Sequence, residues 1–281
     1  MMPRLFKNKL FRNFAFVVGA ILTITIVLIA IFAPFLAPYD PSAQDTSRRR
    51  ESSSTEHLLG LDDLGRDVLS RIIWGARVSL RVGFSVVLIA ATIGILLGAI
   101  AGYFGGIVDT LIMRLCDILL AFPGILLAVA LVAVLGPSLN NVVLALATIG
   151  WVGYARLVRG QVLKVREMEF VTAARAIGAR SHRVILRHVL PNVINPVIVL
   201  ATLGLAGAIL SEAALSFLGL GVQPPTPSWG AMLTSGRNHL GTANHLAIYP
   251  GLAIMLAVMG FNFLGDGLVD ALDPKYRNRR E

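Results

Sequence analysis

The sequence is poor in charged residues and in cysteine. Only 15% of its 281 residues are Asp, Glu, Lys or Arg, while 56% are hydrophobic; ordinary soluble domains carry about 25% charged residues. The single cysteine, Cys116, cannot form a disulfide within the chain, which excludes an oxidised cysteine framework. We expect it to be a small packed residue, because Leu115 and Ile118 beside it are apolar. The composition is that of an integral membrane protein.

Motifs of common nucleotide-binding and hydrolytic enzymes are also absent. The chain has no Gly-x-x-x-x-Gly-Lys-Ser/Thr phosphate loop, no Gly-x-Ser-x-Gly elbow and no His-Glu-x-x-His zinc motif. Its five histidines are not grouped as metal ligands are. We therefore expect no catalytic site and no metal site in this chain, and no nucleic acid as a partner.

Six apolar windows are long enough to cross a membrane as helices, which takes about 20 residues each. The uncharged run 118–155 is too long for one helix, and the turn-forming residues 136–141 divide it. A cleaved signal peptide is the alternative for the first window, but that apolar run exceeds the roughly 7–15 residues of a signal core. We predict an all-α, polytopic membrane protein with about six transmembrane helices, within residues 14–36, 82–108, 118–135, 142–155, 191–220 and 247–265.

The distribution of Lys and Arg predicts the orientation, because positive loops are retained in the cytoplasm. With the N-terminus inside, 17 of the 25 Lys and Arg residues fall in inner segments, so we expect both termini to be cytoplasmic. The predicted parts of the chain are a tail at 1–13, the first span at 14–36, an outer segment at 37–79, a membrane core at 80–265 that includes a basic loop at 165–190, and a tail at 266–281.

The outer segment divides into two parts. Residues 39–56 are rich in Ser and charge, which predicts a flexible linker; the role of its Arg48–Arg50 run stays open. In residues 58–80, apolar residues fall at helical spacing. This pattern fits either an amphipathic helix on the outer membrane surface or a helix that contacts an external partner or gates a pore. The apolar residues are Leu64, Val68, Leu69 and Ile72.

Gly94, Gly98 and Gly102 recur every four residues within the second span. Small residues at this spacing let two helix backbones approach closely in lipid. We predict a tight helix contact, with a neighbour from this chain or from another subunit.

Glu212 is the one acid deep within a predicted span, and an ionisable group there suggests a function. It lies about 30 Å along the helix from Pro191, near the outer face. Two hypotheses follow: a partly hydrated glutamate at the interface, or a residue of the outer gate or substrate path that pairs with Arg66 or Arg77. A proton relay is less favoured, since no second buried acid or histidine accompanies it.

The basic loop predicts two short helices separated by a glycine. Met168, Val171, Ala174 and Ile177 give one apolar edge, and Thr172-Ala173-Ala174 offers small side chains that another protein could approach closely. Gly178 is the expected C-cap, and Ser181 is a possible N-cap of the next helix. The alternative is a loop that rests on anionic lipid, through Arg175, Arg180, Arg183 and Arg187.

Several motifs in this order resemble a known family. Thr172-Ala173-Ala174, Gly178 and Leu190-Pro191 resemble the EAA loop of permease subunits of bacterial ABC importers. Three further segments look like the C-type subunit of the dipeptide/oligopeptide/nickel branch, and the resemblance covers nearly the whole chain after about residue 14. These segments are residues 59–80, 211–221 and 270–274. Thr172 stands where the family usually has glutamate, and Leu61 replaces a common threonine.

The resemblance implies a type I ABC importer (MetI-like) transmembrane fold in the cytoplasmic (inner) membrane. It implies a second homologous permease, two ABC ATPase subunits that bind ATP and Mg, and an extracytoplasmic solute-binding protein as partners, besides membrane lipid. This chain would be non-catalytic and bind no cofactor itself. The loop would couple it to the ATPases, through Glu169, Thr172, Ala173, Ala174, Gly178, Leu190 and Pro191.

The resemblance also implies the cargo class. Peptides, either dipeptides or oligopeptides, are expected on the breadth of the family, and nickel is the alternative within it. An ion-coupled secondary transporter is the main rival outside the family, but the sequence shows no convincing internal repeat and only one acid within its spans.

Overall fold

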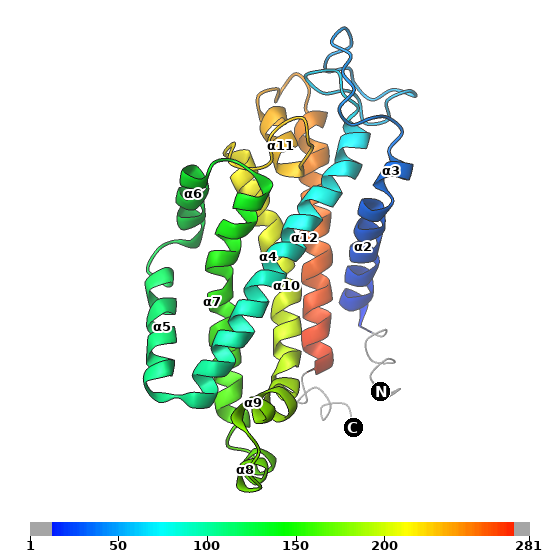
Figure 1. Cartoon of the computed structure of the whole chain (residues 1–281). Coiled ribbons are helices and arrows are strands. Elements are labelled where there is room, and N and C mark those ends of the chain that lie inside the picture. The colour runs from blue at the N-terminus through cyan, green and yellow to red at the C-terminus, as the bar shows by residue number, and fades with distance from the viewer. Residues whose placement is uncertain (1–12, 273–281) are drawn as a thin grey trace.

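The computed structural model describes residues 13–272 as a helical bundle (Figure 1). Apart from one isolated bridge, the described residues form no β-structure, so the all-α prediction is confirmed. The helices are α2 (Phe14–Ile31), α3 (Ala33–Leu36), α4 (Val68–Phe104), α5 (Gly106–Leu120), α6 (Gly124–Leu135), α7 (Leu139–Val165), α8 (Glu169–Ala176), α9 (Ser181–Val184), the π-helix η1 (Ile185–Val189), α10 (Leu190–Phe217), α11 (Trp229–Arg237) and α12 (His245–Leu272). The predicted tail 1–13, save its last residue, and residues 273–281 lie outside the described part.

Five described helices are long and apolar enough to cross a membrane: α2, α4, α7, the continuous helix 181–217, and α12. The bent pair α5–α6 makes a sixth if it counts as one span. Figure 1 shows the start of α2, the end of α12 and helix α8 at one end of the bundle, and α11 with residues 37–67 at the other. We call these the α8 end and the α11 end.

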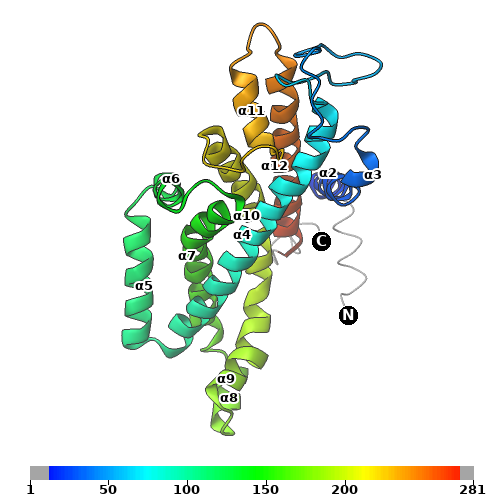
Figure 2. The ribbon, with the colours of Figure 1, turned by 45° about the horizontal axis from the view of Figure 1, so that its top comes forward.

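The third span differs from its prediction. It begins at Gly106 rather than at residue 118, and α5 and α6 meet at an angle of 84° (Figure 2). Pro123 stands at this bend; proline has no N–H to donate and restricts the residue before it, so a helix tends to end there. The uncharged window is shorter than this span because α5 carries Asp109, Arg114 and Asp117.

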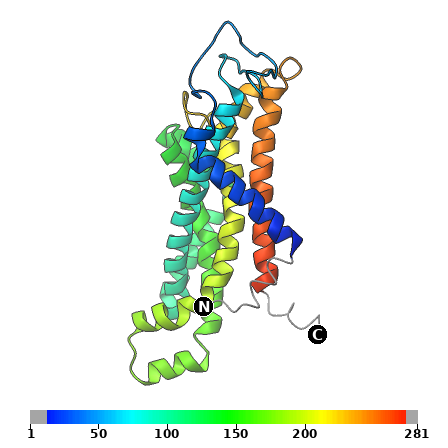
Figure 3. The same cartoon turned by 90° about the vertical axis from the view of Figure 1, so that its right-hand side faces the viewer.

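The glycines of α4 allow the central helix contact, and the neighbour belongs to this chain. A Cβ at Gly94 would collide with Tyr154 of α7, one at Gly98 would lie 2.5 Å from the Ala155 carbonyl oxygen, and one at Gly102 would lie 2.9 Å from Val162. Helices α4 and α7 therefore pack backbone to backbone, as small residues permit in lipid. Helix α2 crosses α12 on the other side of the bundle (Figure 3).

Residues 37–67 form a folded cap at the α11 end, so the predicted flexible linker at 39–56 is wrong. Leu61 N–H donates to the Glu51 carbonyl oxygen at 2.9 Å, and Arg48 pairs with the Glu51 carboxylate at 2.6 Å. This hydrogen bond from Arg48 lowers the pKa of Glu51. Charges that suggested a solvated chain instead bind one another within the cap.

The segment 58–80 is not a separate surface helix. Its residues from Val68 onward are the first turns of α4, which Asp67 caps by accepting a hydrogen bond from Ser70 N–H at 2.7 Å. Val68 and Ser70 are fully buried, and His57 contacts Asp67 at 3.0 Å. The apolar spacing predicted a helix, and the chain is helical from Val68 onward, but Leu64 lies in the turn before it and the continuation into the second span was missed.

Candidate functional site

Helices α8 and α9 stand at the α8 end of the bundle, joined by a turn at residues 177–180 (Figures 1 and 3). Gly178 has a φ of +82°, in the left-handed region, and donates its N–H to the Arg175 carbonyl oxygen at 2.9 Å. Ala179 N–H donates to Ala174 at 3.1 Å. These bonds terminate α8 as glycine C-caps do, so the predicted cap is observed. Nothing lies within 4 Å of a Cβ placed at Gly178; the backbone angle, not space, requires glycine.

The side chains of α8 fall on two faces. Val171 and Ala174 are buried, while Thr172 and Ala173 are exposed. Ile177 is 86% exposed. The predicted apolar edge is therefore divided, and Ala174 belongs to the inner face rather than to the exposed small-residue surface. Thr172 and Ala173, with Glu169 and Phe170 exposed at the start of the helix, are available to another molecule.

Helix α9 runs through η1 into α10 without a break. Together they form one apolar helical stretch from Ser181 to Phe217. Ser181 is the first helical residue, and Arg180 before it makes no side-chain cap, so the proposed Ser181 cap is wrong. Leu190 and Pro191 begin α10 directly after the π-helix. Proline fits there because it lacks a backbone N–H, and short π-helical turns often occur at functional sites.

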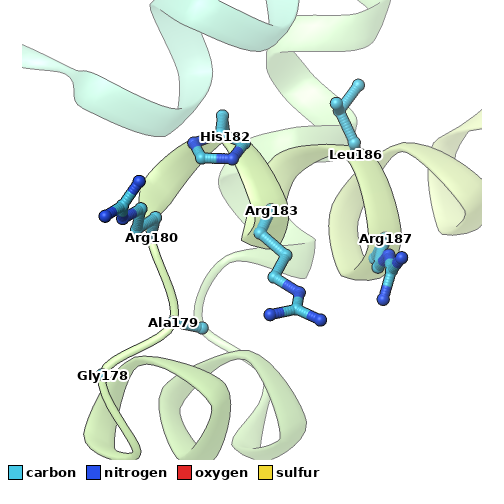
Figure 4. Close-up of a pocket in the computed structure, with 7 residues that line it drawn as sticks. All are labelled: Gly178, Ala179, Arg180, His182, Arg183, Leu186 and Arg187. Carbon is cyan, nitrogen blue, oxygen red and sulfur yellow. The ribbon is translucent and has the colours of Figure 1, made fainter.

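A basic pocket of about 520 Å³ lies between the turn and α9–η1 (Figure 4). In Figure 4 Arg183 and Arg187 extend to the same side of the helix, and Arg180 lies at its start. None of these three arginines forms an ion pair with any residue in 13–272. The pocket is lined by Gly178, Ala179, Arg180, His182, Arg183, Leu186 and Arg187.

Two cationic contacts attach this end of the chain to α4. The Arg175 guanidinium lies over the Tyr103 ring, 4.7 Å from its centre, and Arg166 donates to the Gly102 carbonyl oxygen at 2.8 Å. Arg175 is thus engaged within the chain, unlike the three arginines of the basic pocket. These contacts fix where α8 projects relative to the bundle.

Two ion pairs between α5 and α7 were not predicted. Arg159 binds Asp109 through two hydrogen bonds, one of them 2.6 Å long, and Arg156 binds Asp117 at 2.6 Å. A signal was present, because Asp117 and Arg156 directly flank the uncharged run 118–155. When an uncharged run folds back on itself as two helices, the opposite charges at its two ends come close together and can pair.

Glu212 is completely buried, so the hypothesis of a hydrated interfacial glutamate is wrong. It accepts hydrogen bonds from Ser216 at 2.7 Å and from Ser79 of α4 at 3.3 Å. Ser228, at the start of α11, is also close to its carboxylate. Glu212 therefore links α4, α10 and α11 through hydroxyl groups.

The proposed partners of Glu212 are engaged elsewhere. Arg66 pairs with Asp62 at 2.7 Å, and the Arg77 guanidinium lies over the Trp74 ring at 5.1 Å. The pairing of Glu212 with either arginine is therefore wrong. Ser216 could have been found from its place one helical turn after Glu212, but Ser79 is 133 residues away and no sequence pattern pairs it with Glu212.

Comparison with known proteins identifies relatives over almost the whole chain. Residues 94–278 match the family described as binding-protein-dependent transport system inner membrane component, and residues 4–54 match the N-terminal transmembrane domain of oligopeptide transport permease C. The chain is 50% identical over 271 residues to the dipeptide transport system permease protein DppC of Alkalihalophilus pseudofirmus, covering 96% of this chain and 89% of that protein.

Other relatives have related names. The glutathione transport system permease protein GsiD of Pectobacterium atrosepticum is 45% identical over 276 residues, covering 98% of this chain and 92% of that protein. The inward-facing structure of the MetNI methionine ABC transporter matches with a TM-score of 0.58 at 18% identity, covering 72% of this chain and 96% of that chain. The likeness to the MetNI transporter concerns the fold alone.

Proposed function

The chain belongs to the family of binding-protein-dependent transport system inner membrane components, and we propose that it is a permease subunit of an ATP-driven importer of short peptides. The family and the bundle make it a membrane-embedded subunit of an ABC importer. Its relatives are named for transport of a dipeptide and of glutathione, both short peptides, which favours peptide cargo over nickel.

The observation that carries the proposal is the projecting α8 with its exposed Thr172 and Ala173. In this proposal an ABC ATPase receives α8, and two such ATPases bind ATP and Mg and supply the energy. A second permease completes the pathway, and a solute-binding protein delivers peptide at the α11 end. Because η1 joins α9 to α10 directly, movement of the ATPase would pass into a membrane-spanning helix.

The proposed orientation places the α8 end, with both termini, in the cytoplasm of an inner-membrane protein. It is supported by the position of the start of α2, the end of α12 and helix α8 at one end of the bundle (Figure 1) and by the arginines of the basic pocket there. With this orientation, Ser53→Cys should react with an impermeant maleimide in intact spheroplasts, and Ser181→Cys only after permeabilisation. The reverse labelling pattern would contradict it.

The test of function is uptake of a radiolabelled dipeptide by proteoliposomes that hold both permeases, the ATPases and the binding protein. Uptake should require ATP and should be lost with Ala173→Trp, because a bulky ring on the exposed face of α8 blocks close approach. Ile177→Ala, at the exposed end of the same helix, is the control for folding and assembly. A complex that assembles but shows no ATP-dependent peptide uptake would refute the proposed function.

A further inference from the structure

The cap at the α11 end carries the Arg48–Arg50 run, and its three arginines differ in their contacts. Arg48 pairs with Glu51 at 2.6 Å and with Glu56 at 2.9 Å. Arg49 and Arg50 are exposed, and the side chain of neither forms an ion pair or a hydrogen bond with any residue in 13–272. Membrane proteins concentrate Lys and Arg in their cytoplasmic loops. Two free arginines on the proposed outer side run against that distribution and call for a role.

The turn that carries these arginines is held by the rest of the cap. Asp45 N–H donates to the Gly65 carbonyl oxygen at 3.3 Å, and Arg50 N–H donates to the Asp62 carbonyl oxygen at 2.9 Å. Residues 45–50 are therefore attached at both ends. A Cβ at Gly65 would collide with the Asp45 carbonyl oxygen, so the close approach of the two segments depends on this glycine. The free arginines thus stand on a fixed turn.

Arg50 also has an unusual backbone conformation. Its φ is +58°, and the other described residues with a positive φ are all glycines. Residues with a side chain avoid this region, whereas glycine adopts it readily. Backbone strain of this kind is concentrated at functional sites. An arginine in a position that suits glycine indicates that its side chain serves a purpose outside the fold of the cap.

The cap stands beyond the lipid headgroups. Helix α4 has 37 residues, which is about 55 Å at the α-helical rise, whereas the hydrocarbon core is about 30 Å thick and each headgroup layer about 5–8 Å. The charged residues Arg71, Arg77 and Arg81 lie in the part of α4 nearest the cap. That part therefore extends about 20 Å out of the hydrocarbon, and it carries the cap at its end (Figure 1). A protein in the external medium is a better partner for the cap than lipid.

We propose that Arg49 and Arg50 form a docking site for the solute-binding protein, whose contacting surface presents Asp and Glu carboxylates to them. The inference rests on the proposed function and specifies the surface that receives this partner. Opposite charges on two protein surfaces steer their encounter and fix its orientation. A turn that is already ordered loses little conformational freedom on binding. Arg48, which two glutamates hold, stabilises the turn and does not contact the partner.

The first experiment measures ATP hydrolysis by the complete importer in nanodiscs while the concentration of its binding protein, loaded with dileucine, is raised. The double change Arg49→Glu and Arg50→Glu should raise the half-saturating concentration by about tenfold at low salt, because charge reversal slows association. The maximal rate should not change. The difference should shrink at about 0.5 M salt, where charges are strongly screened. An unchanged half-saturating concentration would overturn the inference, as would a loss confined to the maximal rate.

The matched control is the double change Arg49→Lys and Arg50→Lys, which keeps both positive charges. Its half-saturating concentration should stay within about twofold of wild type, since charge steers the encounter. Both double variants should keep the wild-type melting temperature, because the replaced side chains are exposed and have no ion-pair partner in residues 13–272. Equal losses in the lysine and glutamate variants would show that positive charge is not what the partner recognises, and would overturn the inference.

Arg50→Gly separates docking from folding. Glycine adopts the φ of this turn without strain, so the melting temperature should be unchanged or higher. The half-saturating concentration of loaded binding protein should nevertheless rise by about threefold, because one of the two charges is lost. A lower melting temperature together with unchanged docking would make Arg50 a structural residue and overturn the inference.

The lipid composition of the nanodiscs tests the competing partner. The effect of the double glutamate variant should be the same in phosphatidylcholine alone and in a mixture with phosphatidylglycerol. An effect that requires phosphatidylglycerol would assign the arginines to anionic headgroups and overturn the inference. If loaded binding protein does not stimulate the wild-type complex in either lipid, the proposed function fails together with the docking site. If it stimulates the wild type and the double glutamate variant equally, only the docking site fails.

Discussion

Several charged side chains form ion pairs within the chain at one end of the bundle, whereas the arginines of the basic pocket at the other end have no such partners in the part of the chain that the structure describes. In the cap at the α11 end, the charged pairs lie within the chain: Arg48 with Glu51, Arg66 with Asp62, and His57 with Asp67. At the α8 end, the arginines of the basic pocket meet no acid in residues 13–272. These pairs hold the cap together from within, whereas the arginines of the basic pocket at the α8 end are available to another molecule.

The largest effect is expected from Gly178, which sets the turn at the α8 end. Gly178→Val places a β-branched residue at a φ of +82°, which such a residue avoids. The turn should rearrange, and peptide-stimulated ATP hydrolysis of the reconstituted complex should be almost abolished.

Gly178→Asn is the matched control, because asparagine tolerates the left-handed conformation. It should retain most of the stimulated hydrolysis. Equal activity of the valine and asparagine variants would show that the turn does not position α8, and that the contrast between the two ends is only one of charge.

A smaller effect is expected from the unpaired arginines. The double change Arg183→Glu and Arg187→Glu should weaken ATPase binding by roughly tenfold at low salt. It replaces two positive charges of the proposed interface by negative ones and so removes their attraction to the ATPase. The effect should shrink above about 0.5 M salt, where charges are screened over a few ångströms.

The measurement is retention of the ATPase by the purified permease pair over a range of salt concentrations. Arg49→Glu, a charge reversal in the exposed cap, is the control and should change nothing. If Arg49→Glu weakens ATPase binding as much as the double variant does, the arginines of the basic pocket have no specific role in binding the ATPase.

The smallest effect on transport is expected at Glu212, whose partners are internal. Glu212→Leu leaves the hydroxyls of Ser79 and Ser216 with no carboxylate to bind and should lower the free energy of unfolding by about 1–3 kcal/mol. Glu212→Gln keeps an acceptor oxygen and should lose less. Thermal unfolding of the detergent-purified subunit measures both.

A second measurement tests whether Glu212 also acts in gating. Basal ATP hydrolysis of the reconstituted complex should be the same for Glu212→Gln and wild type if the residue only joins helices. Equal melting temperatures for the leucine and glutamine variants would contradict the linking role that the three serines suggest.

Apolar length and glycine positions in the sequence predicted the structure well, whereas the Ser181 cap was wrong and contacts between charged residues distant in the sequence were missed. Apolar length predicted α2, α10 and α12, and the conformation of Gly178 followed from its place after a small-residue helix. The bend at Pro123 was missed because an uncharged window gives length without direction. The cap was missed because its charges look solvated until Arg48 is seen beside Glu51.

Because α9, η1 and α10 are continuous, a small tilt at Ser181 produces a large sideways displacement at Glu212. Glu212 lies 31 residues beyond Ser181, or about 45 Å along the axis at the α-helical rise. If this stretch pivots as a rod near Ser181, a tilt of about 5° displaces Glu212 sideways by about 4 Å over that length. That distance exceeds the reach of its hydrogen bond to Ser79 of α4, whereas Ser216 moves with Glu212 on the same helix. A rotation too small to disturb packing at one side of the membrane is therefore large enough to exchange side-chain partners at the other.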